Sequence, residues 1–538
     1  MALSSAGLAP LTLLGGETGK IPEEITMEMV LAAEKIAGLS FNGKERQDLL
    51  QDLRSMAEAW RTPVKIPNGL QPGLGDVLDL PEPRPMAAPQ KIKVTLGPSI
   101  AVGDKDLAYF PAAQQARLIR EGSLTSTRLT KLYLRRLKKH DATLHCVITL
   151  LEKRALAQAK AADADLAQGI VKSPLHGVPW GVKDLFAVKE HPTTWGALPF
   201  KDQVIDETAE IVRRLDASGC VLLAKLSTGA LAMGDRWFKE RTRSPWNPQR
   251  GSSGSSAGPA AATAAGLVSF SIGTETLGSI VSPCTRCGTT GIRPTFGLVP
   301  RTGAMALCWT MDKAGPIARN VEDASLVLDL IAGPDQKDLD AIPNSYLSSR
   351  PKSFKDLRIG VLEDAFHQAS PQDKQVLKDL ESLGAQLIPT QVPRPDPRLR
   401  LILNTEAACA FDEITRNGKI RDLVSQGRGA WPRSFRAARF IPAVDYVMAS
   451  RLRTQLKHDM ARAMEPIDVL VTTSYGAGIL MTTNMTGHPC IVMPKGFNQR
   501  NQPRSISFIG HPFDERNLAV AASTWQNATS HHTKRPDF

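Results

Sequence analysis

RGSSGSSAGPAAATAAGLVSFSIGTETLGSIVSPCTRCGTTGIRP, residues 250–294, is the stretch of this sequence around which we expect the fold to be organised. It opens with small residues, which let a backbone approach a ligand closely. Runs rich in glycine and serine are more often flexible linkers. The apolar residues at 260–268 and 270–272 argue against a linker, because a solvated segment would leave them in water. We therefore predict that this stretch is buried.

The same stretch resembles the defining block of the amidase signature family, in which a glycine-serine run precedes a Gly-Gly-Ser turn. Ser279 matches the family's nucleophile, and Ser255 matches its bridging serine at the same interval. The segment HGVPWGVKD at 176–184 resembles the family's lysine strand and supplies Lys183. The resemblance implies a Ser-Ser-Lys catalytic triad with a cis peptide at the bridging serine.

The turn before the nucleophile departs from the family pattern. Its Gly-Gly-Ser is Leu277-Gly278-Ser279 here, and Ala257 stands where the family usually has glycine. The resemblance implies that the backbone N–H groups of Thr276 and the three turn residues form an oxyanion hole. A leucine at 277 needs a conformation that tolerates Cβ, and we expect it to narrow the pocket rather than abolish activity.

A lysine must lose its proton to act as a base near neutral pH. Its ordinary pKa is about 10.4, so a drop of roughly three units is needed, equivalent to about 4 to 5 kcal/mol. Burial among the apolar neighbours of Lys183 would supply it. Ser255 would then relay the proton between Lys183 and Ser279 and return it to the leaving amine.

Each of these residues has an ordinary structural explanation when taken alone. A single strand lysine is usually exposed, and a single turn serine is usually a cap or a turn former. Three such residues, each inside its own family block, favour catalysis over that explanation.

The substrate pocket is harder to place from the sequence. We predict that Ser256, Met233, Trp180 and Trp309 contact the substrate, with Trp195 as a further apolar candidate. No residues predict a cofactor. Cys284 and the cysteine three residues later form a lone C-x-x-C without a second pair, so we predict no metal site.

Composition limits the other function classes. The 538 residues carry 66 Lys plus Arg against 54 Asp plus Glu, a net charge of +12, which invites a nucleic-acid hypothesis. The densest basic run, at 135–139, lies on the polar face of a predicted helix, so no nucleic-acid partner is predicted. Seven cysteines, an odd number, favour reduced thiols over a disulfide framework.

The sequence also leads to predictions about localisation and assembly. No run of about eighteen apolar residues occurs, so no membrane-spanning helix is predicted. Residues 1–16 lack the basic start of a secretory signal. We predict a cytoplasmic protein, or an exported one if the start is a truncated signal, that acts as a monomer or homodimer on a small-molecule amide or carbamate.

The element pattern predicts three parts and an α/β fold. Residues 1–62 form a helical hairpin extension, in which Gly38 ends one helix and Asn42 with Glu45 caps the next. Residues 63–103 form a proline-rich connector. The catalytic domain at 104–538 would have the amidase-signature fold, which has a large mixed β-sheet covered by helices on both faces.

Within the catalytic domain, helical and strand patterns alternate, as α/β folds require. We predict helices at 112–121, 126–139, 151–168, 207–218, 372–383 and 514–529, and strands at 177–188, 221–225, 357–362, 385–389, 467–473, 487–494 and 505–510. Residues 393–442 match no pattern, and we expect substrate specificity to reside there.

Three hypotheses of function follow. The first is a hydrolase that cleaves the C–N bond of linear amides through an acyl-enzyme, with carbamates, urethanes and esters also open. The second is an amidotransferase subunit that releases ammonia from glutamine for a partner, suggested by the helical extension. The third is a catalytically silent binding protein, suggested by the charge and by Leu277.

Overall fold

The computed structural model describes residues 24–60, 90–91, 103–344, 346, 349–367 and 369–537. The chain divides into two compact units, Met1–Val64 and Lys65–Phe538. Most of the predicted connector and the start of the chain lie outside the described residues. Among the described residues, no helix has both the length and the apolarity that crossing a bilayer requires.

The first unit contains two helices, α1 (Met27–Ala37) and α2 (Gly43–Trp60), as predicted. Gly38 ends α1 with a left-handed φ of 63°. Asn42 and Glu45 exchange side-chain to backbone hydrogen bonds, each of 2.9 Å, and so cap the start of α2. The carboxylate of Glu34 on α1 accepts a hydrogen bond from Arg46 on α2 at 2.8 Å, which joins the two helices.

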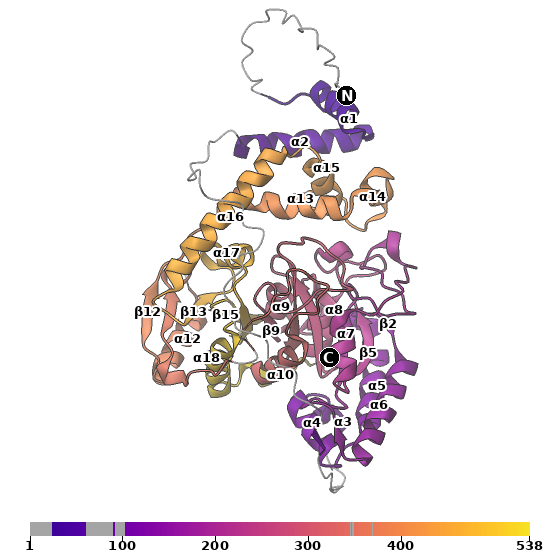
Figure 1. Ribbon diagram of the computed structural model, residues 1–538, viewed down its shortest axis with the longest axis vertical. Helices are drawn as coiled ribbons and strands as arrows, with labels where there is room; N and C mark the ends of the chain where they lie inside the picture. The colour runs from indigo at the N-terminus through magenta and orange to yellow at the C-terminus, as the bar shows by residue number, and fades with distance from the viewer. Residues whose placement is uncertain are drawn as a thin grey trace, which may run out of the picture. The chain divides into compact units, whose positions relative to one another are not determined.

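The second unit is built on one mixed sheet of eleven strands, in the order β12-β11-β13-β15-β14-β9-β10-β8-β4-β5-β2 (Figure 1). The strands are β2 (Val147–Leu150), β4 (Pro179–Lys183), β5 (Val221–Leu226), β8 (Phe270–Glu275), β9 (Thr290–Arg293), β10 (Lys313–Ala318), β11 (Ile359–Leu362), β12 (Leu387–Thr390), β13 (Val469–Thr473), β14 (Cys490–Phe497) and β15 (Pro503–Gly510). Strand β4 runs parallel to β5 and β8, and β11 runs parallel to β12 and β13. The other neighbours in the sheet are antiparallel.

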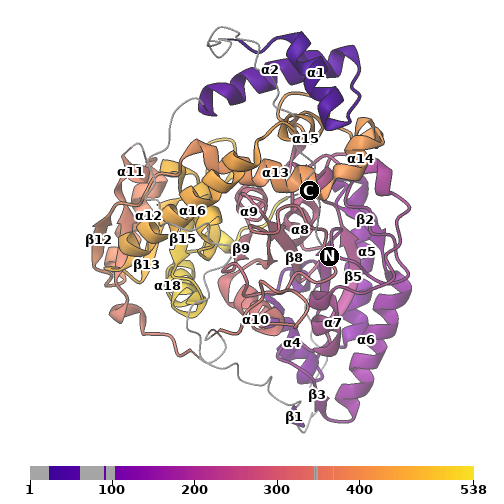
Figure 2. The same cartoon turned by 45° about the horizontal axis from the view of Figure 1, so that its top comes forward.

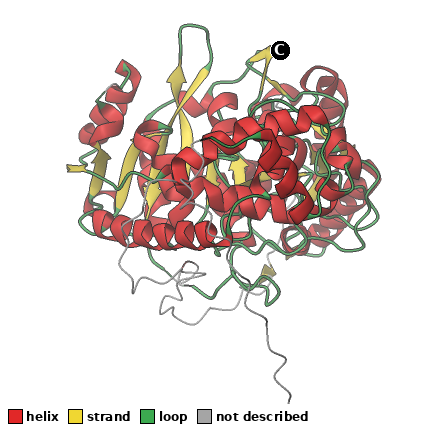
Figure 3. Ribbon diagram, turned by 90° about the horizontal axis from the view of Figure 1, so that it is seen from above, coloured by secondary structure: helices red, strands yellow, loops and turns green. Residues whose placement is uncertain are grey.

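Helices cover both faces of this sheet (Figure 3). Alternate residues of one strand enter different cores, because successive side chains point to opposite faces. In β13, Val469 and Val471 belong to one buried cluster and Leu470 to another. The larger helices are α4 (Ala112–Arg120), α5 (Ser126–Leu144), α6 (Glu152–Ala167), α7 (Glu210–Ala217), α8 (Ala257–Ala264), α9 (Val281–Cys287), α10 (Val321–Ile331), α12 (Pro371–Ser382), α16 (Ala443–Met464), α17 (Ile479–Thr486) and α18 (Glu515–Ala528). The predicted mixed α/β fold is thus confirmed, and α5 and α6 lie beside β5 and β2 (Figure 2).

Residues 393–442, which matched no pattern, are mainly helical. They contain α13 (Arg400–Ala410), α14 (Asp412–Arg416) and α15 (Trp431–Ala438), with short 3-10 turns between them. Helices this short rely on tertiary packing for stability. That packing is aromatic, since Trp431 stacks on Phe435 and Phe435 stacks on Phe411. Because these helices are short, the sequence at 393–442 shows no long amphipathic helical pattern.

The sheet topology brings three strand ends to one edge. β4 and β8 are parallel and end at Lys183 and Glu275, while antiparallel β10 begins at Lys313 opposite Glu275. In α/β sheets, this edge beyond the carboxyl ends of parallel strands is where ligands usually bind.

Candidate active site

Lys183, the predicted base, is fully buried at the end of β4. Its Nζ donates hydrogen bonds to Ser255 Oγ at 2.8 Å and to Thr274 Oγ1 at 2.7 Å. The structure thus brings together the predicted base and the predicted bridging serine, which come from separate parts of the chain. Thr274, on β8, was not singled out from the sequence, where it is a common strand residue.

Burial lowers the pKa of Lys183 to about 7, opposed by the carboxylates of Asp312 and Glu275. Removing an ammonium from water disfavours its charged form, and its two hydrogen-bond partners are neutral hydroxyls. A substantial fraction of this lysine is therefore a neutral amine near pH 7. That is the form in which it can accept a proton.

Ser255 lies in the loop between β7 (Asn247–Gly251) and α8, and the Gly254–Ser255 peptide bond is cis. The next residue ties this loop to the predicted nucleophile, because the Ser256 amide donates to the Ser279 carbonyl at 3.1 Å. No hydrogen bond joins the hydroxyls of Ser255 and Ser279 in this structure. Catalytic hydrogen bonds are often long without substrate and tighten when it binds.

Ser256 was predicted to contact the substrate, but its side chain bonds the backbone of β8 instead. The hydroxyl is fully buried, donates to the Thr274 carbonyl at 3.0 Å and accepts from the Thr274 amide at 3.1 Å. Both hydrogen bonds attach the loop to β8. We therefore correct that prediction, because this hydroxyl anchors backbone rather than facing the pocket.

The turn at 276–279 follows β8 directly. Gly278 adopts a φ of 87°, a left-handed conformation that an L side chain rarely adopts, whereas Leu277 is not in that region. The leucine therefore causes no strain of this kind. Among the described residues, the backbone amides of Leu277, Gly278 and Ser279 donate to no protein acceptor. They are available to a ligand at this turn.

Glu275 holds the turn in place, and the sequence reasoning missed it. Its buried carboxylate accepts hydrogen bonds from the amides of Ile280 at 2.8 Å and Val281 at 2.9 Å, at the start of α9. Arg293 on β9 and Asn484 on α17 donate to it at 2.9 and 2.8 Å. A lone acid ending the small, apolar strand FSIGTE was the available signal.

The electrostatic environment keeps Glu275 ionised. Burial alone would raise its pKa, but the Arg293 guanidinium and the donated hydrogen bonds outweigh this and lower the pKa to about 2. A buried charge is tolerated when it is paired and its lone pairs are satisfied. The carboxylate therefore stays charged near neutral pH and links the turn to the sheet through its hydrogen bonds and its ion pair.

A cavity of about 330 Å³ opens beside the turn. Trp309 lines it with 43% of its surface exposed, and its contact with a substrate stays a prediction. The other lining residues come from the segments after β4 and β5, from β8, from β10 and from the loops before β10 and after α10. They include Leu185, Ala232, Thr274, Thr276, Arg301, Met305, Leu307, Asp312, Lys313, Lys337 and Asp338.

Two further predicted contacts do not line this cavity. Trp180 has no exposed surface and stacks on Phe270 in the hydrophobic core, so its predicted contact with substrate was wrong. Strand alternation explains this, because residue 180 lies on the face opposite residue 183. Met233 follows the lining residue Ala232 but is not itself part of the wall. Trp195 packs against Phe200 and Phe411.

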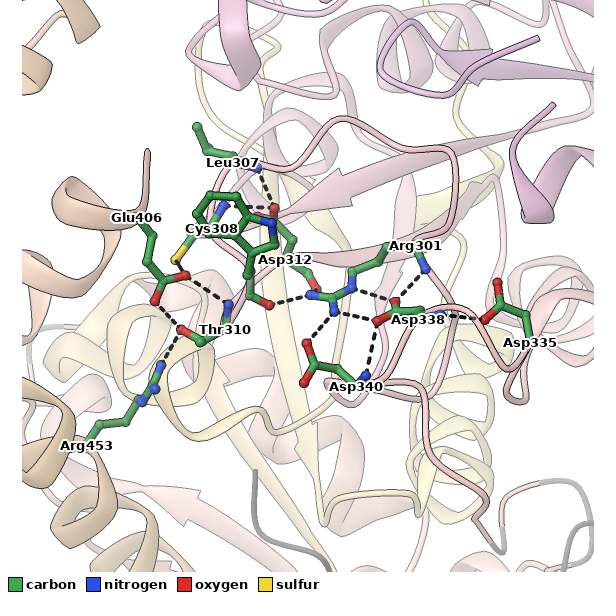
Figure 4. Close-up of polar contacts among 11 residues, drawn as sticks. Arg301, Leu307, Cys308, Thr310, Asp312, Asp335, Asp338, Asp340, Glu406 and Arg453 are labelled. Atoms are coloured by element: carbon green, nitrogen blue, oxygen red, sulfur yellow. Dashed lines mark hydrogen bonds and ion pairs between the residues drawn. The ribbon is translucent and has the colours of Figure 1, made fainter. Parts of the chain in front are cut away.

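The loop at 301–312 forms much of the cavity wall and is anchored at its start (Figure 4). Arg301 donates two hydrogen bonds of 2.8 Å to Asp338 and one of 2.6 Å to Asp340. Asp312, at the other end, accepts from the amides of Leu307 at 2.7 Å and Cys308 at 2.9 Å. Asp312 therefore closes the loop on itself, while Arg301 ties the start of the loop to the segment after α10.

A second anchor reaches the loop from the helices at 400–464. Thr310 donates to Glu406 on α13 at 2.6 Å and accepts from Arg453 on α16 at 2.7 Å (Figure 4). The segment that matched no sequence pattern thus helps to position the wall that carries Trp309.

The cysteines show no metal-binding arrangement. Cys284 and Cys287 lie buried on α9, and burial raises the pKa of the Cys284 thiol to about 12 and that of Cys287 well above its ordinary value. Metal ligation needs the thiolate. Within the described ranges, no cluster of three or more histidine, cysteine or acidic side chains has metal-binding geometry.

Comparison with known proteins places the chain in a family. The family described as Amidase matches residues 128–478. The A-type subunit of glutamyl-tRNA(Gln) amidotransferase from Moorella thermoacetica is 30% identical over 484 residues, covering 80% of this chain and 99% of that protein. The same protein from Thermosynechococcus vestitus is 32% identical over 467 residues, covering 77% of this chain and 97% of that protein.

Solved structures agree with the sequence comparison. An amidase family protein from Bacillus anthracis superposes with a TM-score of 0.72 at 25% identity, covering 81% of this chain and 94% of that one. The native peptide amidase from Stenotrophomonas maltophilia gives 0.71 at 26% identity, covering 80% and 98%. This chain belongs to the amidase family, as its sequence motifs indicated. It is an amidase-family hydrolase.

The buried ion pair between Glu275 and Arg293 leads to a stability prediction. Arg293→Met is expected to lower the free energy of unfolding by about 3–5 kcal/mol, because it leaves the Glu275 carboxylate buried without its countercharge. Denaturant titration of the purified variant measures this. The double variant Glu275→Gln/Arg293→Met should recover part of the loss, since it removes the uncompensated charge as well.

A surface pair serves as the control. Arg394 bonds Asp364 at 2.7 Å but is 74% exposed, so Arg394→Met should leave the unfolding free energy nearly unchanged. Equal losses for the Arg293 and Arg394 variants would show that the turn does not depend on the buried pair.

Proposed function

We propose that this protein is an amidase that hydrolyses the C–N bond of small linear amides through an acyl-enzyme on Ser279. The observation that carries the proposal is the hydrogen bond from the buried Lys183 amine to Ser255, beside a turn whose amides are free. A neutral amine, a hydroxyl relay and unpaired N–H donors are the groups that acyl transfer by serine requires.

The first half-reaction begins when Ser279 Oγ attacks the substrate carbonyl. Its proton passes through the Ser255 hydroxyl to the Lys183 amine, and the carbonyl oxygen becomes an oxyanion. The amides of Leu277, Gly278 and Ser279 stabilise that charge, each donor contributing on the order of 10²- to 10³-fold in rate. The proton then returns through Ser255 to the nitrogen of the leaving group, and the C–N bond breaks.

The second half-reaction releases the acyl group. Water attacks the ester on Ser279, giving its proton to Lys183 through Ser255, and the tetrahedral intermediate collapses to the carboxylic acid. Ser279 regains its proton from the same relay. Carbamates and esters would pass through the same steps, so they belong to the substrate range to be tested.

The nucleophile is tested by labelling. A fluorophosphonate probe should modify the wild type and not Ser279→Ala, whose kcat on a reactive anilide should fall on the order of 10³-fold or more. Ser282→Ala is the matched control, because Ser282 lies close by, at the start of α9. The probe should label this variant as it labels the wild type. A folded wild type that resists the probe and hydrolyses no member of an amide, carbamate and ester panel would rule out the proposal.

The lysine is tested by pH. Because the neutral amine is the active form and its pKa is about 7, kcat/KM on an uncharged amide should rise with pH through about 7 and level off above it. Lys183→Met should lose about 10²- to 10⁴-fold in rate. A rate that is flat from pH 6 to 8, or falls as pH rises, would contradict the assignment.

A second candidate function rests on the relatives. The curated proteins at 30 and 32% identity are subunits of a glutamyl-tRNA(Gln) amidotransferase, which favours glutamine as a substrate and a partner protein as the acceptor of ammonia. Ammonia release from glutamine should then be weak for the chain alone and rise when the other subunits of such an enzyme are added. Equal rates with and without them would favour the free hydrolase.

A further inference from the structure

Lys313 is a second buried lysine at the edge of the sheet that carries Lys183. It is the first residue of β10, is 2% exposed and lines the cavity beside the turn. Its Nζ is buried and has no hydrogen-bond partner among the described residues. The proposed reaction uses no group on this residue.

Other buried lysines near the site are paired. Lys183 donates to two hydroxyls, and Lys225 lies 2.8 Å from the carboxylate of Asp184 and also donates to Thr193. Burying an amine without a hydrogen-bond partner is destabilising, because the amine loses its bonds to water and gains none in the protein. An unpaired donor in a ligand cavity therefore points to a partner that arrives with the ligand.

The acids close to Lys313 are already engaged by other donors. Asp312 accepts from the Thr276 hydroxyl and from two loop amides, and Glu275 is held by Arg293, Asn484 and the start of α9. Farther along the wall, Asp338 is paired with Arg301. Lys313 thus borders the cavity with a buried amine that forms no ion pair or hydrogen bond with the described residues of the wall.

The charges around Lys313 make it responsive to an anion. Burial and the Arg293 guanidinium together lower its pKa to about 7, against the opposing effect of the Glu275 and Asp312 carboxylates and the Cys308 thiol. An anion bound at Nζ would raise the pKa again and hold the amine as ammonium. The side chain is therefore suited to bind a negative group and to release it when protonation is lost.

The position of Lys313 in the sheet relates its amine to the turn, where the scissile bond of a substrate would lie. Lys313 pairs directly with Glu275 across the strands, and Thr276 and the turn amides follow Glu275 in the chain. Thr276 and Lys313 both line the cavity, so a substrate whose carbonyl contacts the turn and whose acyl chain fills the cavity brings the end of that chain towards Lys313. Resting on the proposed amidase function, we infer that Lys313 binds a carboxylate of the substrate, so that the preferred substrates are monoamides of short dicarboxylic acids.

Two matched substrates test the inference. Glutaric acid mono-4-nitroanilide carries the carboxylate, and pentanoic acid 4-nitroanilide has an acyl chain of the same length without it. The wild type should prefer the first. In Lys313→Met, kcat/KM on the charged substrate should fall at least about tenfold, as for a lost hydrogen bond to a charged group, and on the uncharged one stay within about twofold.

Lys355→Met is the control, because Lys355 is an exposed lysine that does not line this cavity. It should change the preference by less than about twofold, since exposed charge interactions are weak. Lys313→Met should fold at least as stably as the wild type, because it removes an unpaired buried amine. Thermal unfolding checks this before the kinetics are compared.

Binding provides a readout that does not need turnover. Glutarate should bind Ser279→Ala more tightly than Ser279→Ala/Lys313→Met by about the same factor as the kinetic loss, measured by calorimetry. Weaker binding as pH rises above about 7 is expected, because the ammonium form holds the carboxylate.

The outcomes separate this inference from the proposed function. Hydrolysis of the uncharged anilide that needs Ser279, together with equal effects of Lys313→Met on both substrates, would overturn the inference and leave the amidase standing. A wild type that prefers the uncharged anilide would also overturn it. Failure of both substrates, without labelling of Ser279, would instead remove the proposed function.

Discussion

The carboxylate of Glu275 is the point on which the site depends. It ends β8, closes the turn onto the start of α9, and is neutralised by Arg293 from the neighbouring part of the sheet. Asn484 adds a bond from α17, on a distant part of the chain. The amides of residues 277–279 donate to no acceptor among the described residues, while this one buried acid satisfies the two amides that follow them. A fixed turn of this kind is what electrostatic stabilisation of an oxyanion requires.

Two buried amines at the same edge work against stability. Lys183 and Lys313 both have a pKa lowered to about 7 by burial, so the folded protein holds them partly neutral near physiological pH, whereas an unfolded chain would hold them charged. Folding therefore opposes their protonation, and stability from this source increases as pH rises from about 7 towards the unfolded pKa of about 10.4. The extensive cores on both faces of the sheet offset that penalty. Active sites often carry such destabilising groups because their function needs them.

The sequence was informative where a residue's context is local. The interval between Ser255 and Ser279, and the apolar strand around Lys183, predicted the region in which the structure places all three, although their catalytic roles stay predictions. The capping of α2 by Asn42 and Glu45 was likewise readable, because capping involves neighbours in the chain. The predictions for Ser256 and Trp180 were wrong because they needed the direction of a side chain. Strand alternation decides it for Trp180, and hydrogen bonds to the backbone of β8 decide it for Ser256.

The sequence by itself determined the family, the mixed α/β class and the order of the motifs, since these follow from local composition and spacing. Only the tertiary structure decided which distant groups meet. Glu275 with Arg293 and Asn484, the anchoring of the 301–312 loop by Asp338 and Glu406, and the unpaired Lys313 depend on the register of β8 against β10 and on the packing of helices far along the chain. Burial sets the pKa of each amine, and burial is a property of the whole fold rather than of the residues beside it in sequence.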